Sequence, residues 1–486
     1  MSFNQEFTIH PVGQGLFYSG KITHNNQVKF RMVFDCGSIT AGAGQEEVEL
    51  YRDADFLGKK VLDLLVISHF DQDHVNHIGK LLADGIKVKK LVMPFISFSE
   101  RLFLVAKFID LNDGFNPDDD FFLRFVIDPL GAMNENLDGD SEIFLIENGS
   151  DGPIPLTKNG SFESQESESN NNNEERFGFS FDNKEPFTEH SLTTKSELKI
   201  FKIKDSEKGN IISSNYINLM EFLFYRRTVG KDEEKFYDKV KELFFEKFSI
   251  DPNIDEVNHL DEIISEVKKI NSGTKIKKIF TKAKNIKDFE KFKDVKITDL
   301  NTTALSLLHK NINGLFYFLG FDNETIINHP YRIFNPFQRN GVIHIQKYIS
   351  SDGSRVETQN FFNSFPFPYY YNENTSNNFI YPNVLLTSDS FLLTQTQVSE
   401  FMNHYRNHWN DYWLFQIPHH GSEKNSNGIL HSVIPKKVTN FINYGIGNRD
   451  NHPSSSVINS LVATGNSVKL ISINQFSGIR FNLNIG

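Results

Sequence analysis

The order of apolar and polar positions in residues 1–95 predicts a mixed structure of strands and helices. Short apolar runs alternate with turn signals, and residues 61–68 form a nearly continuous apolar run of the kind found in strands that are covered on both faces. A polar cluster follows this run directly, and a helix-like segment at 78–82 comes next. Residues 86–93 resume the strand pattern. The rhythm favours an α+β fold and disfavours an all-helical repeat.

The middle of the chain, residues 96–298, has a different character. Apolar side chains fall at helical spacing in two segments, around Phe236–Phe244 and at 260–267, which predicts two helices. The stretch 160–176 is polar and low in complexity, which predicts a disordered loop. We therefore interpret 96–298 as an insertion of mixed but mainly helical structure.

Strand-like runs return in the last third of the chain, and they are found at 303–308, 315–319, 384–387 and 413–417. The simplest organisation is one catalytic fold whose halves, 1–95 and 299–486, are separated by the insertion.

Composition narrows the class of protein. The 486 residues carry a net charge of −11, and a single Cys excludes a disulfide framework and a Cys-based zinc cluster. No apolar stretch is long enough to span a membrane and no secretory signal is visible, so the sequence predicts a cytoplasmic protein without a membrane partner. The lysine-rich segment 268–296 is typical of a solvated surface, and the alternative of a basic patch for nucleic acid or an acidic partner stays open.

The clearest chemical signal follows the apolar run at 61–68. Two His and two Asp occupy six successive positions there, namely His69, Asp71, Asp73 and His74. Imidazole and carboxylate groups without thiolates suit a divalent ion such as zinc, manganese or iron. Because side chains alternate along an extended turn, positions 69, 71 and 73 would face one ion while 74 addresses a second.

Several motifs occur in a fixed order around this cluster. They are Val12-Gly13-Gln14-Gly15, Asp35-Cys36-Gly37, Asn301 with Ala304-Leu305-Ser306-Leu307, Leu385-Leu386-Thr387-Ser388-Asp389, Pro418-His419-His420-Gly421-Ser422, and Asn448 with His452-Pro453. With them, the chain resembles the metallo-β-lactamase fold hydrolases, and most of all the branch related to the hydrolase domain of the competence protein ComEC. The resemblance covers about 1–95 and 299–486, and it implies a four-layer αββα fold interrupted by the insertion.

The resemblance also implies a site for two divalent metal ions. One ion would be held by His69 and Asp71, the other by Asp73, His74 and His420, and Asp389 would bridge them. His419 could replace His420 as the ligand, and the companion His would contact substrate. Asp71 and Asn301 stand where many relatives have His, so the site is richer in oxygen, which shifts its preference from zinc toward manganese or magnesium.

The expected activity is hydrolysis of phosphodiester bonds by a metal-activated hydroxide, with DNA or RNA as substrate, in prokaryotic defence or DNA processing. Asp73 and His452 are the candidate catalytic residues, with Asn448, Asn301 and His419 as substrate contacts or supporting groups. Two alternatives stay open: a phosphodiesterase of small molecules such as cyclic nucleotides or lipid head groups, and an effector subunit gated by a protein partner that docks on the insertion.

Overall fold

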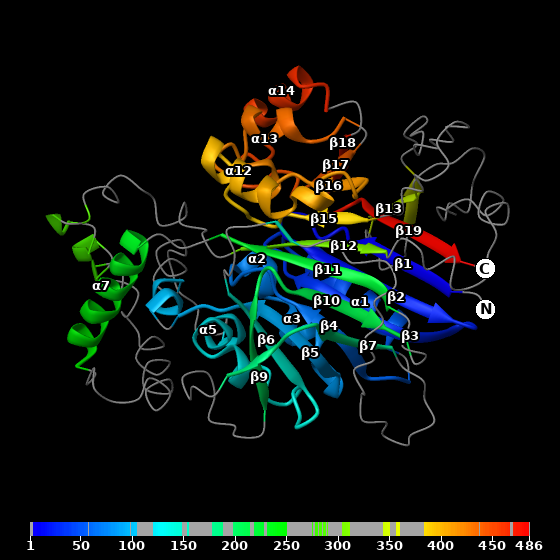
Figure 1. Ribbon diagram of the computed structural model, residues 1–486, viewed down its shortest axis with the longest axis horizontal. Coiled ribbons are helices and arrows are strands. Elements are labelled where there is room, and N and C mark those ends of the chain that lie inside the picture. The colour runs from blue at the N-terminus through cyan, green and yellow to red at the C-terminus, as the bar shows by residue number, and fades with distance from the viewer. Residues whose placement is uncertain are drawn as a thin grey trace.

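A computed structural model shows two mixed β-sheets with helices outside them (Figure 1). It describes residues 3–104, 120–147, 177–187, 198–213, 218–227, 231–249, 304–311, 344–349, 356–359 and 383–485, except 57, 98, 437 and 467–469, together with 153–154 and ten positions between 275 and 289. Among these residues, no helix is long and apolar enough to cross a membrane.

The larger sheet has eleven strands. In spatial order they are β14 (Val356–Gln359), β13 (His344–Ile349), β19 (Gly478–Ile485), β1 (Phe3–Ile9), β2 (Phe17–His24), β3 (Gln27–Cys36), β4 (Val61–Val66), β5 (Lys87–Pro94), β6 (Glu142–Glu147), β9 (Lys199–Lys204) and β8 (Glu185–Pro186). The strands from β3 to β9 are parallel, so their carboxyl ends share one edge of the sheet.

The smaller sheet has eight strands. Its order is β18 (Leu470–Ile473), β17 (Thr439–Asn443), β16 (Leu414–Gln416), β15 (Val384–Leu386), β12 (Leu305–Asn311), β11 (Asn218–Arg226), β10 (Lys208–Ile212) and β7 (Gly178–Phe181). The strands from β15 to β18 are parallel to one another, whereas β7, β10, β11 and β12 pair antiparallel.

Helices cover the outer faces of both sheets. On the larger sheet these are α1 (Ala43–Asp55), α2 (Gln72–Val75), α3 (Ile78–Leu81), α5 (Asp120–Ile127) and α6 (Pro129–Ala132). On the smaller sheet they are α12 (Gln395–His404), α13 (Gly428–Val433) and α14 (Ser455–Ala463), which lie at the top of Figure 1. The helix α7 (Lys231–Phe248) lies to one side of the sheets (Figure 1), where Phe236 and Tyr237 contact Phe103. Short 3-10 turns also occur among the described residues, namely η1 (Ala83–Gly85), η5 (Arg406–His408) and η6 (His419–Gly421).

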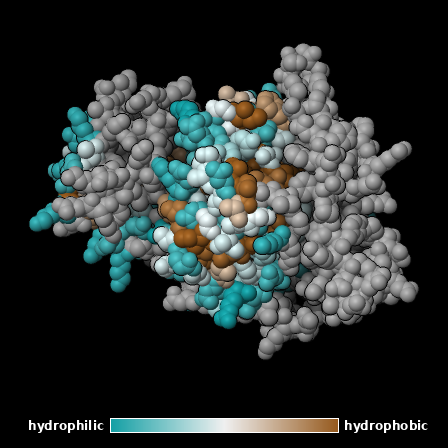
Figure 2. Space-filling view, turned by 90° about the horizontal axis from the view of Figure 1, so that it is seen from above, coloured by the Kyte–Doolittle hydropathy of each residue, from teal (hydrophilic) through white to brown (hydrophobic). Residues whose placement is uncertain are grey.

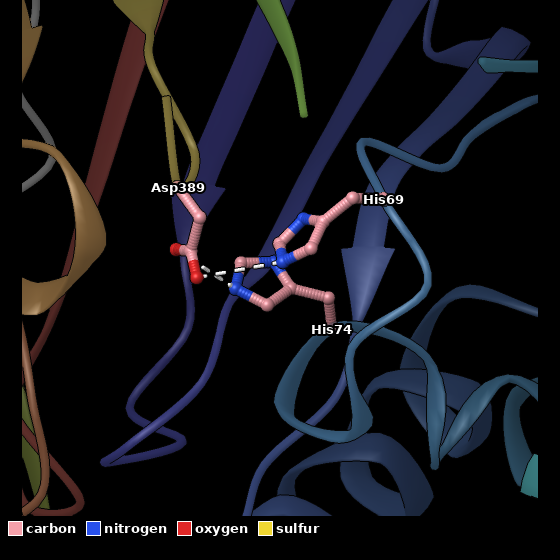
Figure 3. A group of neighbouring side chains, drawn as sticks. All are labelled: His69, His74 and Asp389. Carbon is pink, nitrogen blue, oxygen red and sulfur yellow. Dashed lines mark ion pairs between the residues drawn. The ribbon is translucent and has the colours of Figure 1, made fainter. Parts of the chain in front are cut away.

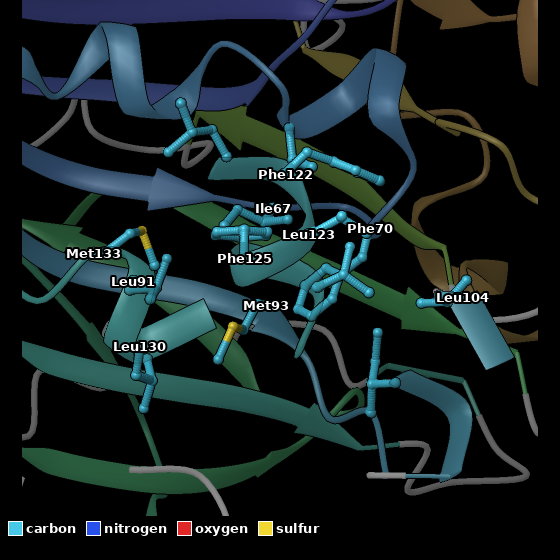
Figure 4. Packing of buried hydrophobic residues seen from close by; sticks show 14 of the residues in the cluster. Ile67, Phe70, Leu91, Met93, Leu104, Phe122, Leu123, Phe125, Leu130 and Met133 are labelled. Atoms are coloured by element: carbon cyan, nitrogen blue, oxygen red, sulfur yellow. The ribbon is translucent and has the colours of Figure 1, made fainter. Parts of the chain in front are cut away.

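Side-chain alternation along the strands divides the core into three apolar layers. Along β4 and the residue after it, Leu65 and Ile67 face the helices of the larger sheet, while Leu64 and Val66 face the smaller sheet. On the smaller sheet, Leu385 faces α12–α14. Figure 4 shows the first of these layers, where aromatic side chains of α5 pack against the strands. Because successive strand residues point to opposite faces, a strand covered on both sides must be largely apolar, as the run at 61–68 is; its buried Asp63 accepts a hydrogen bond from the backbone of Arg31.

Local sequence signals set the ends of several helices. Thr394 accepts a hydrogen bond from the backbone N–H of Gln397, whose side chain bonds back to Thr394, so a capping box begins α12. Asp128 caps α6, which starts at Pro129. On the larger sheet, His10 contacts Glu47 of α1 at 2.7 Å and Ser19 of β2 at 2.7 Å, which ties α1 to the strands beneath it.

The interpretation of 96–298 as an insertion of mixed but mainly helical structure did not assign the strands that the described residues of this part of the chain form. This part of the chain contributes β6, β8 and β9 to the larger sheet and β7, β10 and β11 to the smaller one. It also contains α7, which lies where the spacing around Phe236–Phe244 predicts a helix. The strands were missed because their neighbours in the sheets are remote in sequence. An apolar run such as that of β11 does not indicate by itself to which sheet it belongs.

The strands predicted at 61–68, 86–93, 303–308, 384–387 and 413–417 correspond to β4, β5, β12, β15 and β16. The predicted disordered loop 160–176, helix 260–267 and strand 315–319 lie outside the described residues, as does most of 268–296. The α+β class is therefore confirmed.

Candidate metal centre

The predicted site residues described by the structure lie in loops and short helical turns that follow the carboxyl ends of strands in both sheets. His69–His74 follow β4, Asp389 follows β15, and His419–His420 follow β16. The start of β12 joins this region, because the backbone N–H of Leu305 donates to the carbonyl of Ser68 at 2.8 Å. Segments that are more than 300 residues apart in sequence therefore supply one cluster, as is common where parallel strands end.

Two imidazoles and one carboxylate form the first group (Figure 3). Nε2 of His69 lies 3.4 Å from Oδ2 of Asp389, and Nε2 of His74 lies 3.3 Å from Oδ1 of the same residue. All three side chains are buried. In Figure 3 both rings point toward the carboxylate, which comes from the opposite sheet. One carboxylate thus faces two histidines with its two different oxygen atoms.

The second group consists of Asp73, His74 and His420. Nε2 of His420 lies 2.9 Å from Oδ2 of Asp73, and Nε2 of His74 lies 4.0 Å from the other oxygen of Asp73. His74 is common to both groups, but one ring nitrogen holds only one ion. If His74 serves the second group, His69 and Asp389 remain for the first, with Oδ2 of Asp71 only 3.7 Å from Nε2 of His69.

The Nδ1 atom of each buried imidazole is held by a fixed partner. His74 donates from Nδ1 to Oδ2 of Asp35 at 2.8 Å, and His420 donates to the carbonyl of Asn443 at 2.7 Å. With Nδ1 protonated in this way, the neutral ring presents the lone pair of Nε2.

A chain of hydroxyl groups holds the third imidazole. The hydroxyl of Ser68 donates to Oδ2 of Asp35 at 2.5 Å, and it therefore accepts from Nδ1 of His69 at 2.9 Å. The hydroxyl of Ser388 lies 2.7 Å from that of Ser68. The Nε2 atoms of His69 and His74 make no hydrogen bond although they are buried. Buried nitrogen lone pairs that converge on carboxylates, with the opposite nitrogen anchored, are the usual arrangement of metal-ligating histidines.

Asp35 supports the cluster through hydrogen bonds, and the sequence analysis gave it no such role. It ends β3, it is fully buried, and its carboxylate accepts from the backbone N–H of Ser68 at 2.7 Å in addition to the bonds from Ser68 and His74. The sequence offered it only as part of a motif. The available signal was a carboxylate at the end of a strand that runs next to the strand before the His/Asp cluster.

Two glycines allow the loops to press against the cluster. A Cβ atom on Gly37 would lie 2.4 Å from the backbone nitrogen of His74, and one on Gly15 would lie 2.7 Å from the carbonyl oxygen of Asp73. The same carbonyl accepts from the backbone N–H of Leu16 at 3.1 Å. The Val-Gly-Gln-Gly and Asp-Cys-Gly motifs therefore hold the backbone that carries Asp73 and His74.

The charges of the cluster shift its pKa values strongly. Burial lowers the pKa of His74, but the carboxylates around it, first Asp389 and then Asp73 and Asp35, outweigh burial and raise the pKa well above its usual value. Burial raises the pKa of Asp389, yet the neighbouring histidines lower it well below the usual value. Burial and His74 lower the pKa of His69, but Asp389 and Asp71 together outweigh them and raise it above its usual value. Without a metal ion, the cluster attracts protons; a divalent cation would take their place.

His419 and His420 contact different carboxylates of the cluster. His420 belongs to the second group, whereas Nδ1 of His419 lies 3.6 Å from Oδ2 of Asp389 and its side chain is partly exposed. Both therefore face the centre. The geometry places His420 among the residues that could hold a metal and His419 at its more open side.

His452 and Asn448 lie next to the cluster. The ring of His452 lies 5.6 Å from that of His419 and 6.5 Å from that of His420. Burial, followed by the two histidines, lowers the pKa of His452 to about 4, so it is neutral at physiological pH. The amide of Asn448 bonds to the backbone of Gly445, Asp450 and His452. Asn448 thus positions the loop that carries His452. For the side chain of Asn448 to contact a substrate directly, it would have to give up some of these bonds.

Asn301 lies outside the described residues. His309, which the sequence left unassigned, is not in the centre: it lies between the sheets and accepts a hydrogen bond from the hydroxyl of Tyr18 at 2.6 Å.

The residues present fit divalent ions. The donor set combines imidazole nitrogen and carboxylate oxygen, and its ring orientations are fixed by buried partners. No known protein-family model matches the chain, and no curated protein resembles it at a significant level.

Proposed function

We propose that the chain is a metal-dependent phosphodiesterase of the metallo-β-lactamase fold, acting on DNA or RNA. The observation that carries the proposal is the pair of ligand groups around His74, with Asp389 facing both His69 and His74. The architecture suits the metallo-β-lactamase fold, because layers of helices lie outside two packed sheets and the cluster lies where parallel strands end.

His69, Asp71 and Asp389 would hold one ion, and Asp73, His74 and His420 would hold the other, with Asp389 between them. Two divalent ions in such a site would lower the pKa of a water molecule and neutralise charge on the phosphate. The mixed nitrogen and oxygen donors suit zinc or manganese, with magnesium as a third candidate.

The remaining residues act on the substrate or on the ligands. Asp73 is partly exposed and contacts His420, so it can orient the attacking water as well as hold an ion. His452, neutral and close to His419, can bind a phosphate oxygen or transfer a proton to the leaving oxygen. Asp35, Ser68 and Asn443 keep the three imidazoles in place.

The test is hydrolysis of single- and double-stranded DNA and RNA by purified protein loaded with Mn²⁺, Mg²⁺ or Zn²⁺. The wild-type protein should cleave at least one of them, and Asp389→Asn should lower the rate by about a hundredfold or more, because carboxylates on the ions are central to their placement. His431→Ala is the matched control, since His431 is a buried histidine on α13 whose Nδ1 contacts the hydroxyl of Ser460 at 2.8 Å.

Cleavage of cyclic nucleotides or other small phosphodiesters without cleavage of polymers would replace the nuclease by a small-molecule phosphodiesterase. If no phosphodiester is hydrolysed with any of the ions, or if wild type and Asp389→Asn behave alike, the proposed function is wrong.

A further inference from the structure

Exposed apolar side chains gather beside the candidate metal centre. Among the described residues, four large hydrophobic side chains are strongly exposed: Ile39 at 41%, Ile446 at 53%, Phe476 at 37% and Val462 at 58%. The first three lie on three different loops, after β3, after β17 and between β18 and β19. Only Val462, near the end of α14, lies elsewhere. We call Ile39, Ile446 and Phe476 the apolar rim.

Hydrogen bonds show that the three loops are neighbours. The backbone N–H of Ile39 donates to the carbonyl of Gln14 at 2.8 Å, and the side-chain oxygen of Gln14 accepts from the backbone N–H of Gly445 at 3.2 Å. The backbone N–H of Ile446 donates to the side-chain oxygen of Gln475 at 2.9 Å. The rim residues, or the residues directly before them, are therefore joined by these hydrogen bonds, so the three loops lie side by side.

The same segments adjoin the ligands. Asn443 donates from its side chain to the carbonyl of Gly15 at 2.5 Å, and its own carbonyl accepts from Nδ1 of His420. Leu16 donates to the carbonyl of Asp73. Gln14 and Gly15 thus connect the apolar rim to Asp73 and His420. A substrate whose phosphate reaches the metal centre would have its neighbouring groups at the rim.

We propose that the apolar rim binds unpaired bases of a single-stranded nucleic acid whose phosphodiester lies at the metal centre. This inference rests on the proposed function and names its substrate class. Nucleobases present flat apolar faces that stack on aromatic and aliphatic side chains, and Phe476 with two isoleucines offers such a platform. A duplex hides these faces in its own stack, so it would gain little from the rim.

The charge and polarity around the rim suit a nucleotide strand. Arg449 is exposed on the same loop as Ile446 and can contact a backbone phosphate. Polar Gln475 and Asn448 lie on the same loops as Phe476 and Ile446. Figure 2, which views the molecule from the side of α13 and α14, likewise shows hydrophobic residues in small patches among hydrophilic ones. A membrane surface would favour a broader apolar area and more basic charge than a chain of net charge −11 provides.

The experiment measures binding without metal, so that it does not depend on turnover. Fluorescence anisotropy of a labelled twelve-nucleotide oligo(dT) is followed in EDTA for wild type, Phe476→Leu, Phe476→Trp and Ile446→Ser. Phe476→Leu and Ile446→Ser should each weaken binding about tenfold, whereas Phe476→Trp should bind at least as well as wild type, because base stacking needs an aromatic face. Val462→Ser, an equally exposed apolar position, should bind like wild type.

A wild-type protein that prefers a blunt duplex of the same length would overturn the inference, as would equal affinity in wild type and both weakening variants. Rim-dependent binding to phosphatidylglycerol vesicles instead of oligo(dT) would overturn it in favour of a lipid substrate. Hydrolysis of bis(p-nitrophenyl) phosphate, which has no base, separates the two proposals. If wild type and the rim variants hydrolyse it equally while oligo(dT) binding does not depend on the rim, only the inference fails; if oligo(dT) binds through the rim but no phosphodiester is hydrolysed with any ion, only the proposed function fails.

Discussion

Asp35 accepts a hydrogen bond from Nδ1 of His74 at 2.8 Å, and through the hydroxyl of Ser68 the same carboxylate also holds His69. One buried carboxylate therefore sets the orientation of two of the three imidazoles in the candidate metal centre. It does so from a neighbouring strand, because β3 and β4 are parallel and end at the same edge of the sheet. The orientation of the imidazole rings thus depends on Asp35, which is not itself one of the candidate ligands.

Asp35→Asn should weaken metal binding by about 10- to 100-fold, the usual effect of removing a partner behind a metal-ligating histidine. Oδ1 of Asp35 accepts from the backbone N–H of Ser68, and Oδ2 accepts from the hydroxyl of Ser68 and from His74, so the amide NH2 group meets a donor in either orientation and at least one bond must break. Isothermal titration with Zn²⁺ or Mn²⁺ measures the change. Asp63→Asn is the matched control, since Asp63 is a buried aspartate of β4 that accepts from the backbone of Arg31, and its metal affinity should equal that of wild type. Equal affinities in the Asp35 variant and the control would refute the role of Asp35.

Gly37→Ala should also disturb the candidate metal centre, by displacing the backbone that carries two of its ligands. The added Cβ would lie 2.4 Å from the nitrogen of His74, so the loop carrying Asp73 and His74 must move. We expect the free energy of unfolding to fall by about 1–3 kcal/mol and metal affinity to fall with it. Gly139→Ala, where a Cβ meets nothing within 4 Å, should change both quantities little. Chemical denaturation and metal titration of both variants decide the matter; a Gly37→Ala variant as stable and as tightly metal-binding as wild type would contradict the packing argument.

The affinity for metal should increase with pH across the neutral range. The pKa of His74 lies well above its usual value because nearby carboxylates outweigh burial, so the ring carries a proton that an ion must displace. Each displaced proton makes binding about tenfold tighter per pH unit, until the pKa of the ring is passed. Titrations between pH 6.5 and 8.5, in buffers with different ionisation enthalpies, measure both the slope and the number of protons released. A flat profile without proton release would show that His74 is not a ligand.

His309 should make the fold less stable in mild acid. Burial lowers its pKa to about 3, whereas an unfolded histidine titrates near 6.5. Above pH 6.5 neither state is protonated there; between 6.5 and 3 the unfolded chain binds a proton that the folded chain does not, so stability is lost as the pH falls. His309→Gln, which can still accept from Tyr18, should lose about 1.4 kcal/mol less than wild type between pH 7.5 and 5.5. Urea denaturation at both pH values tests this, and identical losses in both proteins would argue against a buried neutral His309.

Local patterns in the sequence were sufficient for part of the fold. Apolar runs predicted β4, β5, β15 and β16, because strands covered on both faces require mostly apolar side chains. The helix α7 followed from apolar spacing alone. The strands β6–β11 were not recognised as parts of the two sheets, because the local sequence of a strand does not indicate with which remote segment it pairs.

The candidate metal ligands could likewise be predicted from the sequence, but the residues that hold those ligands in place could not. Residue type and spacing singled out His69, Asp71, Asp73 and His74, and motif order added Asp389 and His420; the structure brings these six together. The roles of Asp35, Ser68 and Asn443 depend on which strand ends are neighbours. That information exists only in the folded chain.

The most direct test of the account is the number of metal ions that each chain holds. Protein reloaded with Mn²⁺ or Zn²⁺ and freed of excess ion by dialysis is analysed by inductively coupled plasma mass spectrometry, together with His74→Ala and the control His431→Ala. The account predicts two ions per chain for wild type and for the control, and fewer for His74→Ala, whose ring belongs to both ligand groups. No stoichiometric ion in wild type, or the same content in wild type and His74→Ala, would contradict it.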